Sequence, residues 1–510
     1  MNGKQAKFSE AITNGYTFKG DSVLLGCGIL DGTPVDGIQV KAPLKMFNRH
    51  GLISGATGTG KTKTLQGIAE GLSDAGVPVL VMDIKGDLSG LAAAGNPHLK
   101  IDERHKHIGA AWKATAFPVE LLTLSDEPGA RMRATISEFG PVLLSKILGL
   151  NDTQEGAVAI AFKFCDDNAY PLLDIKDFRA VLQHIIGAGK DEVQQKYGLV
   201  STSSVGAIMR KLLELEQQGA SRFFGELSTD VDDLLRLDSN GRGYINTIRL
   251  ADMQSTPKLF STFMLCLLAE IYEKFPEKGD TDRPELVIFI DEAHLLFDEA
   301  SKALLSQIET IIKLIRSKGV GIFFCTQLPT DIPDAVLSQL GMKVQHALRA
   351  FTAKDRKSIK QVSENYPISE FYHIDQVLTQ MGTGEAFITL LNEKGIPSPL
   401  VHTLLKAPAS RMDVLTDEEI KKLIRSSALV TKYNTDIDRE SAYEILTAKL
   451  QKSAKDDAAL QVEEKRTTTR STRQTKTTFE KVMASSVTRT IVREVTRGIL
   501  GVLGIKSRRR

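Results

Sequence analysis

The sequence of 510 residues predicts an α/β fold, with a mainly parallel sheet flanked by helices and a helical subdomain inserted into it. Three observations carry this prediction. An apolar run at 51–54 enters a glycine-rich loop and leaves through a helix-like segment at 63–70. Near-continuous apolar runs at 77–82 and 286–290 are typical of parallel strands covered on both faces. Between them, long stretches with helical periodicity replace strand-like runs.

These composition changes predict several successive parts of the chain. Residues 1–45 hold short apolar runs broken by glycine, which favours a few small strands. We expect a β-rich segment at 1–45, an α/β core at 46–97 and 256–405, a mainly helical insertion at 98–255, a helical extension at 406–464, a basic linker at 465–478 and a basic amphipathic helix at 479–510.

Bulk properties exclude several classes of protein. The hydrophobic content of 42% and the charged content of 25% are ordinary for a globular protein. The four cysteines are far apart, which argues against a disulfide framework or a zinc site and suits a reducing compartment. The N-terminus lacks the apolar stretch of a signal peptide, and the most apolar window, 260–272, is too short to span a bilayer. We therefore expect a cytoplasmic protein.

The loop at 55–62 is the main candidate site. It matches G-x-x-x-x-G-K-[ST] at every fixed position and lies between a predicted strand and a predicted helix. In that context successive backbone N–H groups converge on a phosphate, the lysine reaches the β- and γ-phosphates, and the following threonine can hold Mg²⁺. The predicted nucleotide-binding residues are Gly55, Ala56, Thr57, Gly58, Thr59, Gly60, Lys61, Thr62 and Lys63.

A second half of the site is predicted at Asp291 and Glu292, which end the apolar run at 286–290. A nucleotide hydrolase needs one carboxylate for the Mg²⁺ shell and another to activate the attacking water. Asp291 suits the first role, beside Thr62, and Glu292 the second. The cofactors expected from these residues are ATP and Mg²⁺.

Three further residues are candidates for the hydrolysis step. Gln327 follows the predicted strand 321–325, where a polar side chain could sense the γ-phosphate or the water. An arginine, often from a neighbouring subunit, can stabilise the charge that develops on a transferred phosphoryl group. Arg316 and Arg349 lie near predicted strand ends, and the sequence favours neither over the other.

The motifs together resemble the HerA/FtsK group of RecA-like motor ATPases, and most closely a bacterial family of HerA-like ATPases. The stretches that carry this likeness are 48–50, 55–62, 83–87, 241–246, 291–292, 315–320, 326–327, 339–341 and 345–350. The resemblance implies a RecA-like P-loop NTPase that assembles as a hexameric ring and uses ATP to translocate or unwind DNA. By the same likeness, Lys61 and Thr62 match the phosphate and magnesium positions, and Asp291, Glu292 and Gln327 match the metal, water-activating and sensor positions.

The C-terminal region differs in charge from the rest of the chain. Residues 465–510 contain 13 Lys and Arg against 2 Asp and Glu, a net charge of +11. Arg489, Arg493 and Arg497 recur at helical spacing on one face. Such a segment could attract DNA, lie on an anionic membrane surface, or pack on a neighbouring subunit. The sequence thus leaves open an alternative function, an ATP-driven switch or assembly ATPase that acts on a protein partner or at a membrane without a nucleic-acid track.

Overall fold

The computed structural model describes residues 3–253, 257–279, 281–297, 302–435, 437 and 439–452. The chain divides into two compact units, residues 1–446 and 447–510. The predicted basic linker and amphipathic helix at 465–510 lie outside the described residues. Everything below concerns the first unit.

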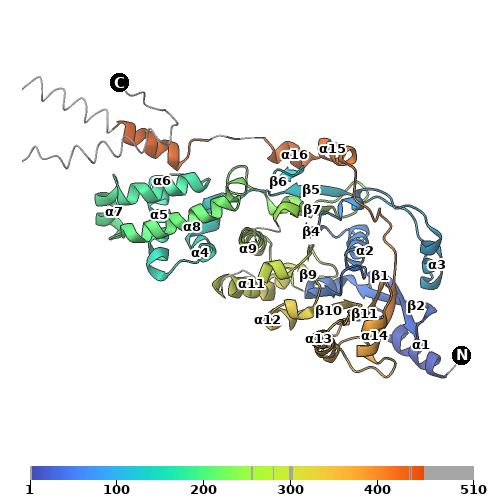
Figure 1. Ribbon diagram of the computed structural model, residues 1–510. Coiled ribbons are helices and arrows are strands. Elements are labelled where there is room, and N and C mark those ends of the chain that lie inside the picture. The colour runs from blue at the N-terminus through green and yellow to red at the C-terminus, as the bar shows by residue number, and fades with distance from the viewer. Residues whose placement is uncertain are drawn as a thin grey trace, which may run out of the picture. The chain divides into compact units, whose positions relative to one another are not determined.

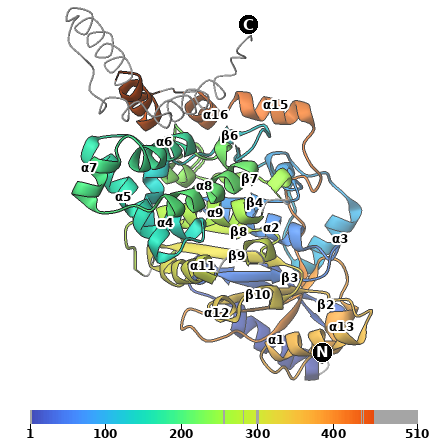
Figure 2. The ribbon, with the colours of Figure 1, turned by 60° about the vertical axis from the view of Figure 1, so that its left-hand side comes forward.

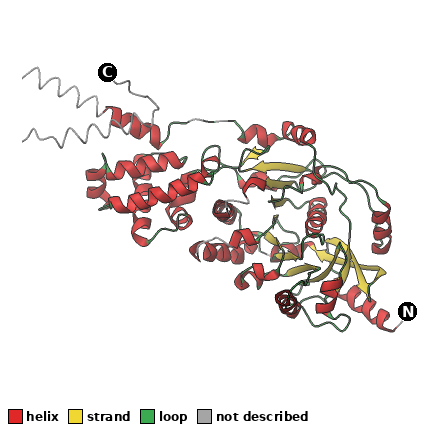
Figure 3. Ribbon diagram, viewed as in Figure 1, coloured by secondary structure: helices red, strands yellow, loops and turns green. Residues whose placement is uncertain are grey.

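One mixed sheet of twelve strands organises this unit (Figures 1 and 3). Its order is β2-β1-β12-β11-β10-β3-β9-β8-β4-β7-β5-β6, parallel from β10 to β6 and antiparallel from β10 outward to β2. The strands are β1 (Ser22–Leu30), β2 (Thr33–Pro43), β3 (Gly51–Ser54), β4 (Val79–Asp83), β5 (Val119–Thr123), β6 (Ala130–Arg131), β7 (Ile245–Arg249), β8 (Leu286–Ile290), β9 (Val320–Thr326), β10 (Met342–His346), β11 (Glu385–Leu390) and β12 (Val401–Leu405). The mainly parallel sheet predicted from the sequence is confirmed.

The central strands bury both faces, as their apolar sequences predict. Side chains of β4, β8 and β9 alternate between two cores. Val81, Phe289 and Phe323 join the core that holds α1 (Gly3–Tyr16) and α2 (Lys61–Asp74). Their neighbours Met82, Ile290 and Phe324 join the opposite core, beneath α9 (Pro257–Lys274) and α11 (Lys302–Ile315).

A cluster of helices extends the second core away from the sheet (Figure 2). It contains α4 (Ile136–Ile147), α5 (Asp152–Asn168), α6 (Ile175–Ile186), α7 (Lys190–Tyr197) and α8 (Thr202–Gln217). Side-chain caps such as Asn151, which accepts from Gln154 N at 3.1 Å, define where these helices begin. The stretch expected to be mainly helical, 98–255, also contributes α3 (Leu99–Ile108) and the sheet strands β5, β6 and β7.

The remaining helices complete the two ends of the unit. The expected β-rich segment at 1–45 supplies β1 and β2, but it begins with the helix α1. Short helices α10 (His294–Phe297) and α12 (Asp334–Leu337), together with α13 (Ala353–Glu364) and α14 (Ile374–Gln380), lie between the later strands. The extension after β12 forms α15 (Asp417–Arg425) and α16 (Ala428–Tyr433). The division of the chain into domains stays a proposal.

Candidate nucleotide site

The glycine-rich loop joins β3 to α2 through backbone conformations that favour glycine. Gly55, Gly58 and Gly60 have φ angles of 150°, 77° and 111°. A Cβ at Gly55 would lie 2.5 Å from Cβ of His346, and one at Gly60 would lie 3.2 Å from the backbone N of Gly384. The glycines therefore serve both the turn itself and its close packing on the strands below.

Lys61 begins α2 and is almost completely buried. Its Nζ donates to the carbonyl of Gly55 at 2.6 Å and to that of Ala56 at 3.2 Å, so the amine lies over the loop. Burial and the nearby Lys85 lower the pKa of Lys61, while Glu292 and Asp291 act to raise it. The amine of Lys61 thus lies within electrostatic reach of the predicted acid pair, although 230 positions separate Lys61 from Asp291 in the chain.

The sheet order explains this convergence. β3 is flanked by β9 and β10, and β9 in turn pairs with β8. All these strands are parallel, so the loop after β3 and the acids after β8 emerge at the same edge, one strand apart.

The acid pair at the end of β8 is buried, with Asp291 3% and Glu292 9% exposed. Burial raises the pKa of Asp291 to about 6, Lys85 opposes this shift and Glu292 adds to it. Asp291 Oδ2 and Glu292 Oε2 are buried acceptors without a hydrogen-bond partner among the described residues. Buried acceptors normally find a donor or a cation, and Mg²⁺ prefers oxygen ligands. The donor set therefore fits Mg²⁺ held by Asp291 and the Thr62 hydroxyl.

A third element of the site, the loop after β4, was not assigned a role from sequence. Asp83 accepts backbone N–H groups from Gly86 at 2.8 Å, Asp87 at 3.2 Å and Leu88 at 3.1 Å, which fixes the turn. Burial raises the pKa of Asp83 to about 7. The turn brings Lys85 Nζ to 2.5 Å from Glu292 Oε1. Only the resemblance of residues 83–87 to related motifs pointed to this segment.

Gln327 lies beside the phosphate loop. The backbone N of Gly55 faces the carbonyls of Thr326 and Gln327 at 3.3 Å and 3.2 Å. The hydroxyl of Thr326 donates to Asp331 Oδ2 at 2.6 Å, which holds this corner. The side chain of Gln327 is exposed at the edge that carries the acids. Its sensor role stays a prediction.

The structure separates the two candidate arginines. Arg316 precedes β9, so it lies at the sheet edge opposite the phosphate loop, where it contributes to the low pKa of His50. Arg349 follows β10 at the phosphate-loop edge and is exposed, with its guanidinium donating to the carbonyl of Thr379 at 3.1 Å. Neither arginine contacts Asp291 or Glu292 through a hydrogen bond or ion pair that the described residues show. The catalytic role of either arginine stays a prediction.

Lys63 holds the start of α2 to a segment far away in the chain. Its Nζ donates to the carbonyl of Met412 at 2.6 Å and to Gln66 Oε1 at 3.1 Å. Glu70, further along α2, accepts from the backbone N of Ala409 at 2.8 Å. The segment that follows β12 therefore stabilises the helix that carries Lys61 and Thr62.

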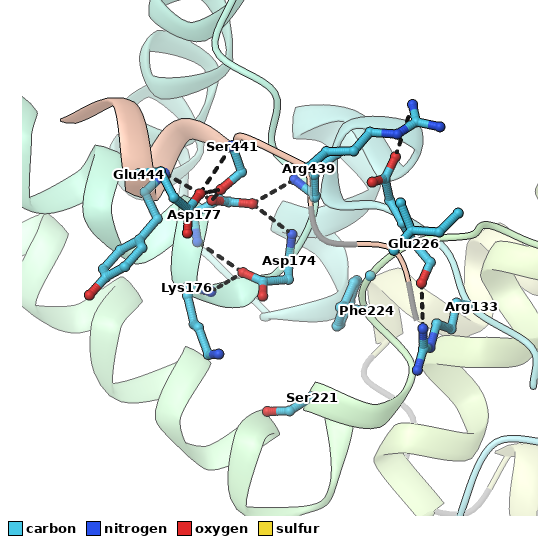
Figure 4. Close-up of a pocket in the computed structure, with 14 residues that line it drawn as sticks. Arg133, Asp174, Lys176, Asp177, Ser221, Phe224, Glu226, Arg439, Ser441 and Glu444 are labelled. Carbon is cyan, nitrogen blue, oxygen red and sulfur yellow. Dashed lines mark hydrogen bonds and ion pairs between the residues drawn. The ribbon is translucent and has the colours of Figure 1, made fainter. Parts of the chain in front are cut away.

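A separate polar pocket lies between the helical cluster and the chain after α16 (Figure 4). Asp177 of α6 accepts from the backbone N of Tyr443 at 2.9 Å and from the hydroxyl of Ser441. Arg439 lies 3.6 Å from Glu226 Oε1 at its rim. None of the residues that line this pocket belongs to the predicted nucleotide site. Its contacts attach the end of the unit to the helical cluster.

The strand order, the glycine loop and the acidic strand end define a P-loop NTPase with a RecA-like core. The family model described as "Helicase HerA-like C-terminal" matches residues 30–509, and the chain belongs to this family. Within the described residues, no helix is both long and apolar enough to cross a bilayer.

Individual relatives agree with this assignment. The chain is 22% identical over 357 residues to the "DNA double-strand break repair helicase HerA" of Sulfolobus acidocaldarius, and 25% identical over 358 residues to that of Sulfurisphaera tokodaii. Each alignment covers 69% of this chain and 64% of the relative, so the chain matches less than two thirds of either.

Solved structures support the fold. The bacterial conjugative coupling protein TrwB superposes with a TM-score of 0.50 at 15% identity, covering 80% of this chain and 94% of that protein. At this identity the likeness concerns the fold alone.

Proposed function

We propose that the chain is an ATP-hydrolysing motor of the HerA/FtsK type that assembles as a hexameric ring and translocates along or unwinds DNA. The observation that carries the proposal is the placement of Lys61 opposite Asp291 and Glu292 at one sheet edge. Each of the two acids has a buried carboxylate oxygen without a hydrogen-bond partner among the described residues. ATP with Mg²⁺ supplies the phosphates and the charge that such a site would bind.

Each residue of the site has a distinct task in this proposal. The loop N–H groups and Lys61 hold the phosphates, and Thr62 and Asp291 hold the metal. Glu292 accepts a proton from the attacking water as the new O–P bond forms and the bond to the leaving ADP breaks. Burial of the acid pair keeps bulk water away, which strengthens these interactions.

A basic surface on α13 supports a nucleic-acid track. Lys354, Arg356, Lys357 and Lys360 are exposed there, and Phe351 beside them is 87% exposed. The carboxylate of Asp355, within the same turn, is engaged by the backbone N–H groups of residues 351 and 352 at 2.9 Å and 2.8 Å. A basic surface with a free aromatic ring suits a nucleic-acid backbone and a stacked base. The archaeal relatives are themselves named DNA repair helicases.

The test is ATP turnover with and without DNA over a series of salt concentrations. We expect DNA to stimulate turnover at low salt, with the effect fading as salt rises. K354Q/K357Q/K360Q should weaken DNA binding and reduce its salt dependence by a slope of about 2–3. The matched control, K421Q/K422Q/R425Q on α15, removes the same charge from another exposed surface.

Two outcomes would contradict parts of the proposal. Turnover that DNA never stimulates at low salt would favour the alternative, a switch or assembly ATPase without a nucleic-acid track. Equal loss of DNA affinity in both triple variants would contradict the assignment of the track to α13. Particle mass with and without a non-hydrolysable ATP analogue tests the hexamer.

A further inference from the structure

The conformation of Glu292 points to a residue that positions it. Glu292 has a φ of 44°, in the left-handed region that residues other than glycine rarely adopt. This turn, directly after β8, carries its carboxylate into the buried end of the sheet. Of its two oxygens, Oε1 contacts Lys85, whereas Oε2 has no hydrogen-bond partner among the described residues and lies 3.4 Å from His294 Nδ1.

Lys85 reaches Glu292 from the neighbouring strand. β4 pairs with β8 on the side away from β9, so Lys85 approaches the acids from the side opposite Lys61. Its Nζ lies 2.5 Å from Glu292 Oε1 and 3.9 Å from Asp291 Oδ2. Burial acts to lower the pKa of Lys85, but the carboxylates of Asp291 and Glu292 raise it.

The carboxylate of Asp83 holds the loop that carries Lys85 in place. The carboxylate of Asp83 accepts three backbone N–H groups of residues 86–88, and Gly86 supplies the positive φ of 74° that the turn requires. A rigid loop of this kind fixes where the lysine amine lies. A general base whose orientation is fixed by a third group is a recurring arrangement in catalytic sites.

We propose that Lys85 is a positioning residue for Glu292. Lys85 holds Oε1 of Glu292, so that Oε2 of the same carboxylate faces the attacking water. The inference rests on the proposed ATP hydrolysis. Water gives its proton to Oε2 as its oxygen bonds to the γ-phosphorus, and the oxygen between the β- and γ-phosphates leaves with ADP. Lys85 takes no proton in this step and does not bind the phosphates, a role that Lys61 has.

This assignment separates turnover from nucleotide binding. A lysine that acts only through Glu292 affects the transition state and leaves ground-state affinity for ATP intact. Loss of geometry at a general base costs about 10- to 1,000-fold in rate. Removal of a phosphate ligand would instead weaken ATP binding.

The experiment measures kcat, KM and the Kd of a fluorescent ATP analogue in the full chain carrying K85Q, K85M or K85R. We expect K85Q and K85M to lower kcat by at least about 10-fold, with KM and Kd within about 3-fold of the wild type, and K85R to recover part of kcat. The control is K278Q, which removes a lysine 3.4 Å from Glu285 at the other end of β8. It should match the wild type.

A double variant tests whether Lys85 acts through Glu292. The residual rate of K85Q/E292Q should equal that of E292Q alone, because two residues that work as one unit are not additive. Thermal unfolding of each variant distinguishes a loss of rate from a loss of fold, and K85M preserves the aliphatic stem of the side chain.

The outcomes distinguish this inference from the proposed function. A wild-type protein that does not hydrolyse ATP would contradict the proposed function. An active wild type with kcat unchanged or raised in K85Q and K85M would overturn the role of Lys85 alone. A 10-fold weaker Kd in K85Q would also overturn it, since it would make Lys85 a phosphate ligand.

Discussion

Thr64 of α2 and His346 of β10 meet beneath the phosphate loop, with Thr64 Oγ1 and His346 Nε2 2.9 Å apart. His346 is completely buried, and burial with the nearby Lys61 lowers its pKa to about 3. The neutral ring therefore ties the helix that carries Lys61 to the strand next to β3. The sequence gives no sign of this contact, because 282 positions separate its two partners.

The stability of the protein should depend on His346 at mildly acidic pH. Between its folded pKa of about 3 and the ordinary value of 6.5, the unfolded chain binds one more proton, so stability falls as pH drops below about 6.5. Through His346, the free energy of unfolding should fall by about 1–2 kcal/mol between pH 6.5 and pH 5. Urea unfolding of the wild type and H346Q over this range measures it.

In H346Q the free energy of unfolding should fall less steeply with decreasing pH. His50, whose pKa burial lowers to about 4, contributes a similar slope in both proteins, so the difference isolates His346. Parallel pH profiles for the two proteins would show that His346 is not neutral in the folded state.

Two glycines of α2 should respond to alanine in opposite directions. A Cβ at Gly67 would have Lys406 Cε as its nearest neighbour at 3.5 Å, whereas one at Gly71 would lie 2.5 Å from Val23 Cγ1. G67A should stabilise the protein by about 0.5–1 kcal/mol through helix propensity. G71A should destabilise it by about 1–3 kcal/mol through overpacking against β1. Chemical denaturation tests both, and a stable G71A would contradict the packing of α2 on β1.

K61A should remove nucleotide binding together with turnover. Lys61 is the first residue of α2, and its amine adds its charge to the N–H groups of the helix start. We expect ATP affinity to fall by at least about 10-fold and hydrolysis to disappear. Equilibrium titration with an ATP analogue, with circular dichroism as a check on folding, measures this. Unchanged affinity would place the phosphates elsewhere.

Arg349 is the better candidate for an arginine that acts on a neighbouring subunit, because it is exposed whereas Arg316 is partly buried. R349A should reduce turnover by about 1,000-fold with ATP affinity retained. Mixing R349A with K61A protein should restore some activity, since a ring with both subunits contains interfaces with an intact site and an intact arginine. If the mixture stays inactive while both proteins assemble, Arg349 does not act in trans.

The sequence predicted the strands that hold the site because they are continuous apolar runs. It did not reveal β5 and β7 inside the expected helical insertion, because polar residues interrupt their pattern. Glu120 of β5 is buried beside Arg236, at 2.8 Å. Asn246 of β7 is buried as well and donates to the carbonyls of Val79 and Leu234. Such pairing makes polar side chains compatible with a buried strand, and it depends on partners that a local pattern does not contain.

The candidate site was predictable where local spacing defines it. The glycine loop and the acid pair each occupy one short stretch, and parallel strands bring their ends to a common edge. Lys85 and His346 contact residues that are distant in sequence, Glu292 and Thr64. The helix α1 was missed although Phe8, Ile12 and Tyr16, which it buries, recur at a spacing of four residues.

Single-turnover hydrolysis of ATP by wild-type and E292Q protein, with ATP affinity measured on the same samples, tests the convergence of the loop and the acid pair most directly. The amide of E292Q cannot accept a proton from water, so bound ATP should remain intact, with turnover at least about 100-fold slower and affinity unchanged. Hydrolysis at the wild-type rate, or an equal loss of affinity, would contradict the role of Glu292 as the base that faces Lys61 across the bound triphosphate.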